Sequence, residues 1–174
     1  MNPPSDSASA EAPPSTRAPL PAFAERTHFA ALDWAKDHHD FVLLEARGRV
    51  VFHLRFEHSS EGWQKLRGRV AAALPADSSA LAVAIETSHG LAVEALQQAG
   101  YVVFPVNPKQ AQRFRERKAP SGLKDDVLDA WTLADALRTD GHAWRHLPPE
   151  DPLNLLRFLG QAERKGQRPT THVR

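Results

Sequence analysis

Three short, nearly continuous apolar runs constrain what this chain can fold into more than any other feature of its sequence. They span residues 28–35, 79–86 and 101–106. Apolar residues at every position, without alternation, are expected of strands that are covered on both faces of a sheet. Such strands need helices on both sides, so these runs predict an α/β fold.

The segments between these runs set the order of the elements. Two further strand-like runs, 41–46 and 49–56, are joined by a turn at Arg47-Gly48, so the first three strands should form an antiparallel meander. Helical spacing of apolar residues then predicts helices over 59–74, 91–99, 109–118 and 123–137. We therefore expect a mixed five-stranded sheet with three antiparallel strands, then alternating helix and strand, with helices on both faces.

The two ends of the chain differ in composition from its middle. Residues 1–26 hold six prolines among serine and alanine, a composition expected to stay disordered because it buries too little surface to offset the entropy of ordering. Residues 148–174 hold one amphipathic helical piece and then a polar run. We expect one folded domain between them, over residues 27–147.

Composition excludes several kinds of chemistry. The chain has no cysteine, which excludes disulfides, thiolate nucleophiles and zinc-thiolate sites. It has no apolar run approaching the ~18 residues of a membrane span and no secretory leader, so we expect a soluble cytoplasmic protein without a membrane partner. The formal net charge is +1, so any argument for nucleic-acid binding must be local.

Four carboxylates are expected to converge in this fold. Asp33 interrupts the first apolar run and Glu86 ends the second, and a right-handed crossover would place these two strands side by side. On the helix over 123–137, Asp126 and Asp129 lie on one shoulder of the apolar stripe, whereas Asp125 points away from it. Like charges held together near buried surface suggest a divalent metal, although acidic residues at a helix start are also ordinary solvated groups. Four carboxylates could hold two ions about 4 Å apart, the geometry of phosphoryl-transfer enzymes.

The helix over 109–118 is strongly basic. It contains five basic residues and one acid, a local charge of +4, which suits contact with nucleic-acid phosphates, although a solvated basic face is the alternative. Arg113 and Arg117 are the first choices, since they lie one turn apart. The predicted nucleic-acid-binding residues are Lys109, Arg113, Arg115, Arg117 and Lys118.

Two other groups of residues receive structural interpretations. The polar run 36–40 includes adjacent histidines, His38 and His39, but neighbours on a strand point to opposite faces, so we interpret this run as a surface turn and not as a metal site. Trp34 and Trp131 are interpreted as packing residues in preference to base-stacking ones.

The order of these motifs resembles a known family. The chain has Asp33, then Ala84-Ile85-Glu86-Thr87, then Pro105-Val106-Asn107-Pro108, then Lys124-x-Asp126-x-x-Asp129-Ala130. In this combination it resembles the N-terminal DEDD domain of the IS one-ten insertion-sequence transposases, over about His28 to Leu159. That domain is similar to the RuvC Holliday-junction resolvases and has the ribonuclease H-like fold.

The resemblance implies a bacterial DNA recombinase that acts at the nucleoid on insertion-sequence ends. Magnesium, for which manganese can substitute, would be held by Asp33, Glu86, Asp126 and Asp129. A structured guide RNA would be a second partner besides DNA, and full-length proteins would form homo-oligomers. Relatives continue into a second domain that carries a nucleophilic serine, so we expect a truncated or partial copy that does not exchange strands alone.

Three alternatives are kept beside this interpretation. One is a non-catalytic nucleic-acid-binding remnant or regulator that keeps the fold without the chemistry. Another is a nuclease like the Holliday-junction resolvases. The third, a sugar-kinase or actin-like ATPase, would need a glycine-rich phosphate loop, and Asp33 is followed by Trp34-Ala35-Lys36 without such a glycine.

Overall fold

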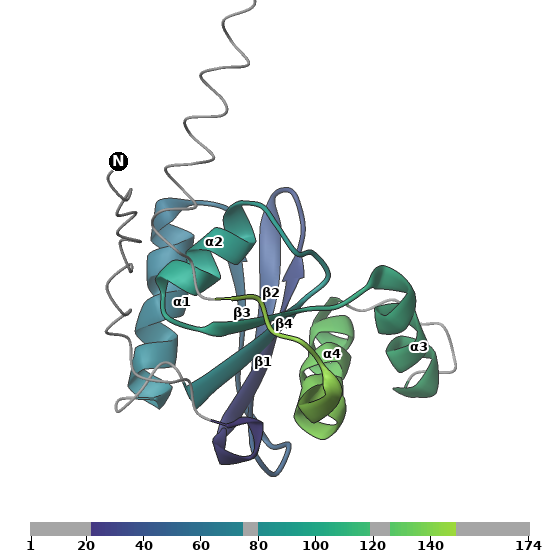
Figure 1. Ribbon diagram of the computed structural model, residues 1–174. Helices are drawn as coiled ribbons and strands as arrows, with labels where there is room; N and C mark the ends of the chain where they lie inside the picture. Colours follow the sequence, from purple (N-terminus) through teal and green to yellow (C-terminus); the bar gives the residue numbers. More distant parts are fainter. Residues whose placement is uncertain (1–21, 75–79, 119–125, 149–174) are drawn as a thin grey trace, which may run out of the picture.

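A computed structural model describes residues 22–74, 80–118 and 126–148, with only the backbone of Asp126. Figure 1 shows the elements. The strands are β1 (His28–Trp34), β2 (His38–Glu45), β3 (Val50–Glu57), β4 (Leu81–Ile85) and β5 (Val102–Pro105). The α-helices are α1 (Ser60–Ala73), α2 (Leu91–Gln98), α3 (Pro108–Lys118) and α4 (Asp126–Asp140), and the 3-10 helices are η1 (Phe23–Glu25) and η3 (Gly141–Ala143).

The five strands form one mixed sheet in the order β3-β2-β1-β4-β5. β1, β2 and β3 pair antiparallel, whereas β4 pairs parallel with β1 and β5 parallel with β4. This arrangement confirms the predicted meander followed by helix–strand alternation. It also places β4 next to β1, because the connection from β3 passes through α1 before the chain re-enters the sheet beside its first strand.

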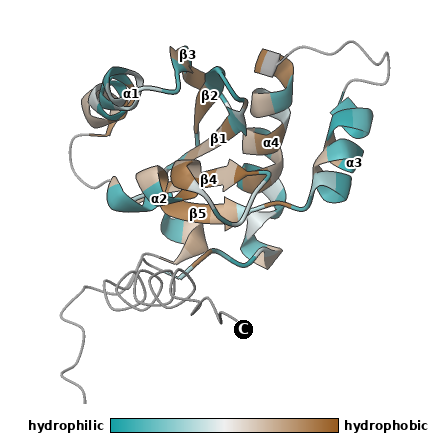
Figure 2. Cartoon of the chain, turned by 90° about the horizontal axis from the view of Figure 1, so that it is seen from above, coloured by the Kyte–Doolittle hydropathy of each residue, from teal (hydrophilic) through white to brown (hydrophobic). Residues whose placement is uncertain are grey.

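Helices cover both faces of the sheet. α1 and α2 lie on one face, and α4 lies on the other with α3 beside it (Figure 1). Seen from above, β4 and β5 are largely apolar, whereas α3 is largely hydrophilic (Figure 2). Side chains alternate along β1, so that Ala30 and Leu32 belong to the core under α1 and α2 and Phe29 and Ala31 to the core under α4. Burial on both faces explains why the strands are apolar throughout.

The helix α1 begins where the sequence offers a cap. The Ser59 hydroxyl accepts a hydrogen bond from the Gly62 backbone N–H at 3.1 Å, which satisfies a donor at the helix start. Trp63, Leu66 and Val70 then recur at helical spacing and are buried against the sheet. Both observations confirm the prediction for this segment.

The run 36–40 is not the surface turn that we predicted. β2 begins at His38, and both His39 and Asp40 are buried. Asp40 lies directly opposite Arg55 in the register of β2 and β3, and its carboxylate accepts hydrogen bonds from Arg55 Nη2 at 2.7 Å and His53 Nε2 at 2.6 Å. A carboxylate can be buried at a strand end when a cross-strand partner neutralises it. The polarity of residues 36–40 therefore led to the wrong prediction of a surface turn.

Regular structure is already present before residue 27, where we expected the domain to begin. Phe23–Glu25 form η1, and the Phe23 ring lies 5.5 Å from that of Phe29, between ring centroids. A single aromatic side chain thus ties the end of the proline-rich segment to the core under α4. Residues 1–21 lie outside the described residues.

The helix α4 has the predicted helical phase. Ala130, Ala134 and Leu137 are all buried in the core on its side of the sheet. Residues 119–125, which include Leu123 and Asp125, lie outside the described residues, as does the amphipathic piece after residue 148. No helix in the described ranges is long and apolar enough to cross a membrane.

Candidate active site

Asp33 and Glu86 lie side by side at the carboxyl ends of the neighbouring strands β1 and β4. Leu32 of β1 pairs with Ile85 of β4. Asp33 directly follows Leu32, and Glu86 directly follows Ile85. Because the two strands are parallel, their carboxyl ends meet at the same edge. Ala31 and Ala84, two positions earlier, are buried under α4, so strand alternation directs both acids to that same face.

The third acid comes from α4. Asp129 precedes the buried Ala130, and its side chain is 17% exposed. Asp126 is the first residue of α4, three positions earlier, which is about one helical turn. The structure therefore places Asp129 near Asp33 and Glu86, and Asp126 on the preceding turn of the α4 helix. The Asp126 side chain lies outside the described part.

An arginine lies between two of these acids. The Arg115 guanidinium is ion-paired with Glu86 through Nη2, and its Nε lies 3.2 Å from Asp129 Oδ1. The second contact is an ion pair without hydrogen-bond geometry, since Nε is buried and has no hydrogen-bond partner. Arg115 therefore neutralises the acids electrostatically while leaving one of its donors unsatisfied.

The motif Asn107-Pro108 explains how Arg115 reaches this position. The Asn107 side-chain oxygen accepts a hydrogen bond from the Lys109 backbone N–H at 2.9 Å, so Asn107 caps α3 and Pro108 fills its first turn. The Val106 N–H donates to the Ile85 carbonyl at 2.8 Å. The start of α3 is thus fixed to the end of β4, immediately before Glu86.

These residues enclose a pocket of about 450 Å³. Asp33, Glu86, Asp129 and Arg115 supply its charged groups, and Trp34, Ala35 and Thr87 complete its lining. The pocket opens at the carboxyl edge of the parallel strands, where open α/β sheets usually bind ligands.

Among the described side chains, no three acids or histidines are placed to hold a single metal ion. Two of the acids instead share a cation from the protein itself, since the Arg115 guanidinium bridges Glu86 and Asp129. The donor set nevertheless fits a hard divalent ion, because carboxylate oxygens are the ligands that magnesium prefers. The acids also already attract a cation, which is the electrostatic requirement of such a site.

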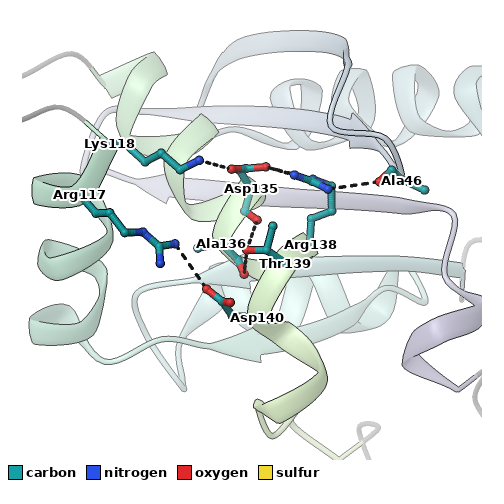
Figure 3. Close-up of polar contacts among 8 residues, drawn as sticks. All are labelled: Ala46, Arg117, Lys118, Asp135, Ala136, Arg138, Thr139 and Asp140. Carbon is teal, nitrogen blue, oxygen red and sulfur yellow. Dashed lines mark hydrogen bonds and ion pairs between the residues drawn. The ribbon is translucent and has the colours of Figure 1, made fainter.

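Two of the predicted nucleic-acid-binding residues form ion pairs between α3 and α4 (Figure 3). Lys118 Nζ lies 2.7 Å from Asp135 Oδ2, and Arg117 Nη2 lies 3.5 Å from Asp140 Oδ2. Arg138 of α4 pairs with the other Asp135 oxygen at 2.6 Å. Burial opposes the charge of Asp135, but hydrogen bonds from Lys118 and Arg138 outweigh it and hold the pKa of this carboxyl below its usual value.

The remaining basic residues of α3 face solvent. Lys109 and Arg113 are exposed, and neither side chain forms an ion pair with another described residue. They are the cations of this helix that could contact phosphates without first leaving an internal partner. The predicted basic patch therefore divides into Arg115 in the pocket, two residues that anchor α3, and two exposed residues.

Sequence reasoning missed the placement of Arg115 and the exposure of Trp34. Arg115 was grouped with its helix neighbours, and no spacing in the sequence could have shown that its side chain meets Glu86, 29 positions away. Trp34 was expected to pack, yet it is 41% exposed. No such signal exists in the sequence for Asp40 either, because a register shift between Leu43 and Leu44 moves its cross-strand partner one position from the residue that counting back from the turn gives.

Comparisons with known proteins identify the family to which this chain is related. Residues 30–165 match the DEDD_Tnp_IS110 family model, which describes a transposase. The chain is 40% identical over 127 residues to the mini-circle putative transposase for IS117 of Streptomyces coelicolor, covering 73% of this chain and 31% of that protein. It is 38% identical over 130 residues to the putative transposase y4uE of Sinorhizobium fredii, covering 74% and 36%.

The chain thus spans about a third of the length of these relatives, 31% and 36%.

Among solved structures, RuvC of T. thermophilus in complex with a Holliday junction substrate is similar, with a TM-score of 0.48 and 18% identity, covering 70% of this chain and 100% of that chain. The matched residues include all four predicted acids and all of α3 and α4, and the family match excludes the ATPase alternative. The chain belongs to the DEDD_Tnp_IS110 family of transposases.

Proposed function

We propose that this chain is the metal-dependent DNA-processing domain of an insertion-sequence transposase. Asp33, Glu86, Asp126 and Asp129 hold divalent ions, magnesium in the cell, and the pocket receives a DNA phosphodiester. The observation that carries the proposal is the convergence of Asp33, Glu86 and Asp129 in one pocket, where Arg115 bridges Glu86 and Asp129. Membership of a transposase family supports the same reaction class.

The four acids come from two kinds of element, strand ends and a helix. Asp33 and Glu86 stand on adjacent strand ends and are held by the sheet, whereas Asp126 and Asp129 belong to α4. Divalent ions bound between the sheet and the helix would polarise the phosphodiester and stabilise charge on its oxygens. The protein's own contribution is to fix these oxygen ligands on rigid elements, so that little reorganisation is needed when the ion and DNA bind.

Arg115 and the exposed cations position the DNA. Glu86 and Asp129 would hold the ion if metal bound here, and the Arg115 guanidinium, which lines the same pocket, would then be available to a phosphate oxygen. A guanidinium matches a phosphate in geometry and charge. Lys109 and Arg113 are exposed on the same helix, on a side that faces away from the pocket, and supply phosphate contacts outside it.

The wider assembly is part of the proposal. We infer that the chain works at the nucleoid with DNA and a structured guide RNA, within a homo-oligomer of a longer protein. Support for this comes from the resemblance to insertion-sequence transposases and from the family match.

The decisive experiment measures metal-dependent stability. Mn²⁺ and Mg²⁺ should raise the melting temperature of the wild-type chain, because a ligand that binds only the folded state stabilises it by mass action. Asp33→Asn should abolish this increase while leaving the metal-free fold intact. Asp37→Asn is the matched control, since it removes an exposed carboxylate from the adjoining turn, outside the pocket. A metal-induced increase that survives Asp33→Asn would refute the assignment of the site.

A second candidate function rests on the Arg115 ion pairs. With Arg115 bridging Glu86 and Asp129, the chain can also serve as a nucleic-acid-binding module without metal-dependent chemistry. In that case DNA binding would be present without divalent ions and unaffected by adding them. The same titration with Mn²⁺ distinguishes the two functions, because only the first predicts metal-dependent stabilisation.

A further inference from the structure

Trp34 is an exposed aromatic side chain at the edge of the candidate active site. It follows Asp33 directly, ends β1 and is 41% exposed. The other large apolar side chains exposed within the described ranges, Val50, Val51 and Leu91, are aliphatic. Trp34 also contributes to the lining of the pocket that holds Asp33 and Glu86.

The indole is held in place by stacking on a buried histidine. The Trp34 and His39 rings are nearly parallel, 13° apart with centroids at 4.7 Å, and His58 meets the indole edge-on at 5.0 Å. His39 is buried, its Nδ1 accepts from the Ala35 N–H at 3.3 Å, and its Nε2 contacts His58 Nδ1 at 3.0 Å. The proton of His39 therefore lies on Nε2, and the ring under Trp34 is fixed by hydrogen bonds on both nitrogens.

Strand alternation places the ring a short way from the acids. Asp33 faces α4, and its neighbour Trp34 faces the opposite side, toward the start of α1. A DNA strand whose phosphate entered the pocket would run past the indole, because Trp34 lines the same pocket. From that position the ring could meet a flanking base.

We propose that Trp34 forms a binding subsite for an unpaired nucleobase of the DNA strand whose phosphate enters the pocket, an inference that rests on the proposed function. An indole stacked on one ring offers its remaining surface to another planar ring, and base–aromatic stacking accepts any base because every base has a π-face. The stacked His39 keeps the indole in one orientation, so little freedom is lost when the base binds.

The surroundings favour a base over a protein partner. Protein interfaces are built from contiguous apolar patches. Trp34 instead has polar neighbours: its ring contacts the imidazoles of His39 and His58, and the turn residues Ala35–Asp37 that follow it are exposed, with two of the three charged. A single ring beside charged groups that suit phosphates matches the alternation of base and backbone in a nucleic-acid strand.

The test compares two DNA strands that have the same phosphates. Affinities of the wild-type chain, Trp34→Ala, Trp34→Phe and the control Val51→Ala would be measured for a thymidine oligonucleotide. The same measurements use an abasic deoxyribose-phosphate strand of equal length. Val51→Ala removes an exposed apolar side chain from β3, away from the pocket. Melting temperatures establish that each variant is folded.

Trp34→Ala should weaken binding of the thymidine strand roughly 5- to 100-fold and leave binding of the abasic strand unchanged. Trp34→Phe should retain most of the affinity, and Val51→Ala all of it. An equal loss on both strands would overturn the inference, because Trp34 would then act through the structure. Unchanged DNA binding with a loss of self-association in sedimentation would overturn it in favour of a protein interface. If the wild-type chain bound neither strand, the proposed function would fail together with this inference.

Discussion

Replacing Arg115 by alanine should increase the affinity of the chain for divalent metal. In the metal-free protein the Arg115 guanidinium pairs with Glu86 and Asp129, so an ion that takes these carboxylates must first displace it. The three side chains are 29%, 28% and 17% exposed, so solvent screens both pairs and each is worth about 0.5–1 kcal/mol. Removing Arg115 should therefore strengthen metal binding by about 1–2 kcal/mol, roughly 5- to 30-fold in Kd.

Isothermal titration with Mn²⁺ measures this change directly. Arg113→Ala is the matched control, because it removes the same charge from an exposed position of the same helix and should alter the Kd little at physiological salt. Arg115→Ala should also lower the melting temperature of the metal-free chain, since it leaves two carboxylates uncompensated, and Mn²⁺ should restore it. An unchanged or weaker Kd in Arg115→Ala would refute the reasoning, because the arginine would then not compete with the ion.

Three further predictions concern the acids, the exposed cations and the buried histidine. Asp129→Asn should abolish stabilisation by Mn²⁺ at a cost of less than about 1 kcal/mol to the metal-free fold, whereas Asp125→Asn should change neither quantity; equal effects in thermal melts would show that the helical phase is wrong. The double variant Lys109→Ala with Arg113→Ala should bind duplex DNA more weakly and reduce the slope of log K against log salt by up to about 2, and an unchanged slope would exclude these residues from phosphate contact. Burial, followed by the nearby His58 and His38, lowers the pKa of His39 from 6.5 to about 4. Between these values the unfolded chain binds a proton that the folded chain does not, so stability should be lost as pH falls from 6.5 toward 4. Urea unfolding of the wild-type chain and His39→Gln across this range should show a smaller loss in the variant, and parallel curves would contradict the assignment.

Much of the fold follows from local pattern. Uninterrupted apolar runs predicted the buried strands, and the spacing of Trp63, Leu66 and Val70 predicted α1 with its cap at Ser59. These predictions succeed because buried apolar residues recur at different spacings in strands and in helices, and this spacing does not depend on distant contacts. The run 36–40 failed for the opposite reason. Asp40 is buried because Arg55 and His53 lie across from it, and a partner on another strand decides whether a polar residue can be buried.

By itself, the sequence determined which acids could meet and on which elements they lie. Asp33 and Glu86 were identified from their places at the ends of apolar runs, and Asp129 from its angle on a helix, because strand order and helical phase are properties of the chain's own periodicity. Only the tertiary structure decided how that charge is balanced. It placed Arg115 between Glu86 and Asp129, used Arg117 and Lys118 to hold α3 on α4, and left Trp34 partly exposed on His39. Ion pairs and ring contacts join residues far apart in the chain, and a long side chain's partner depends on the packing of whole elements, which no local spacing records.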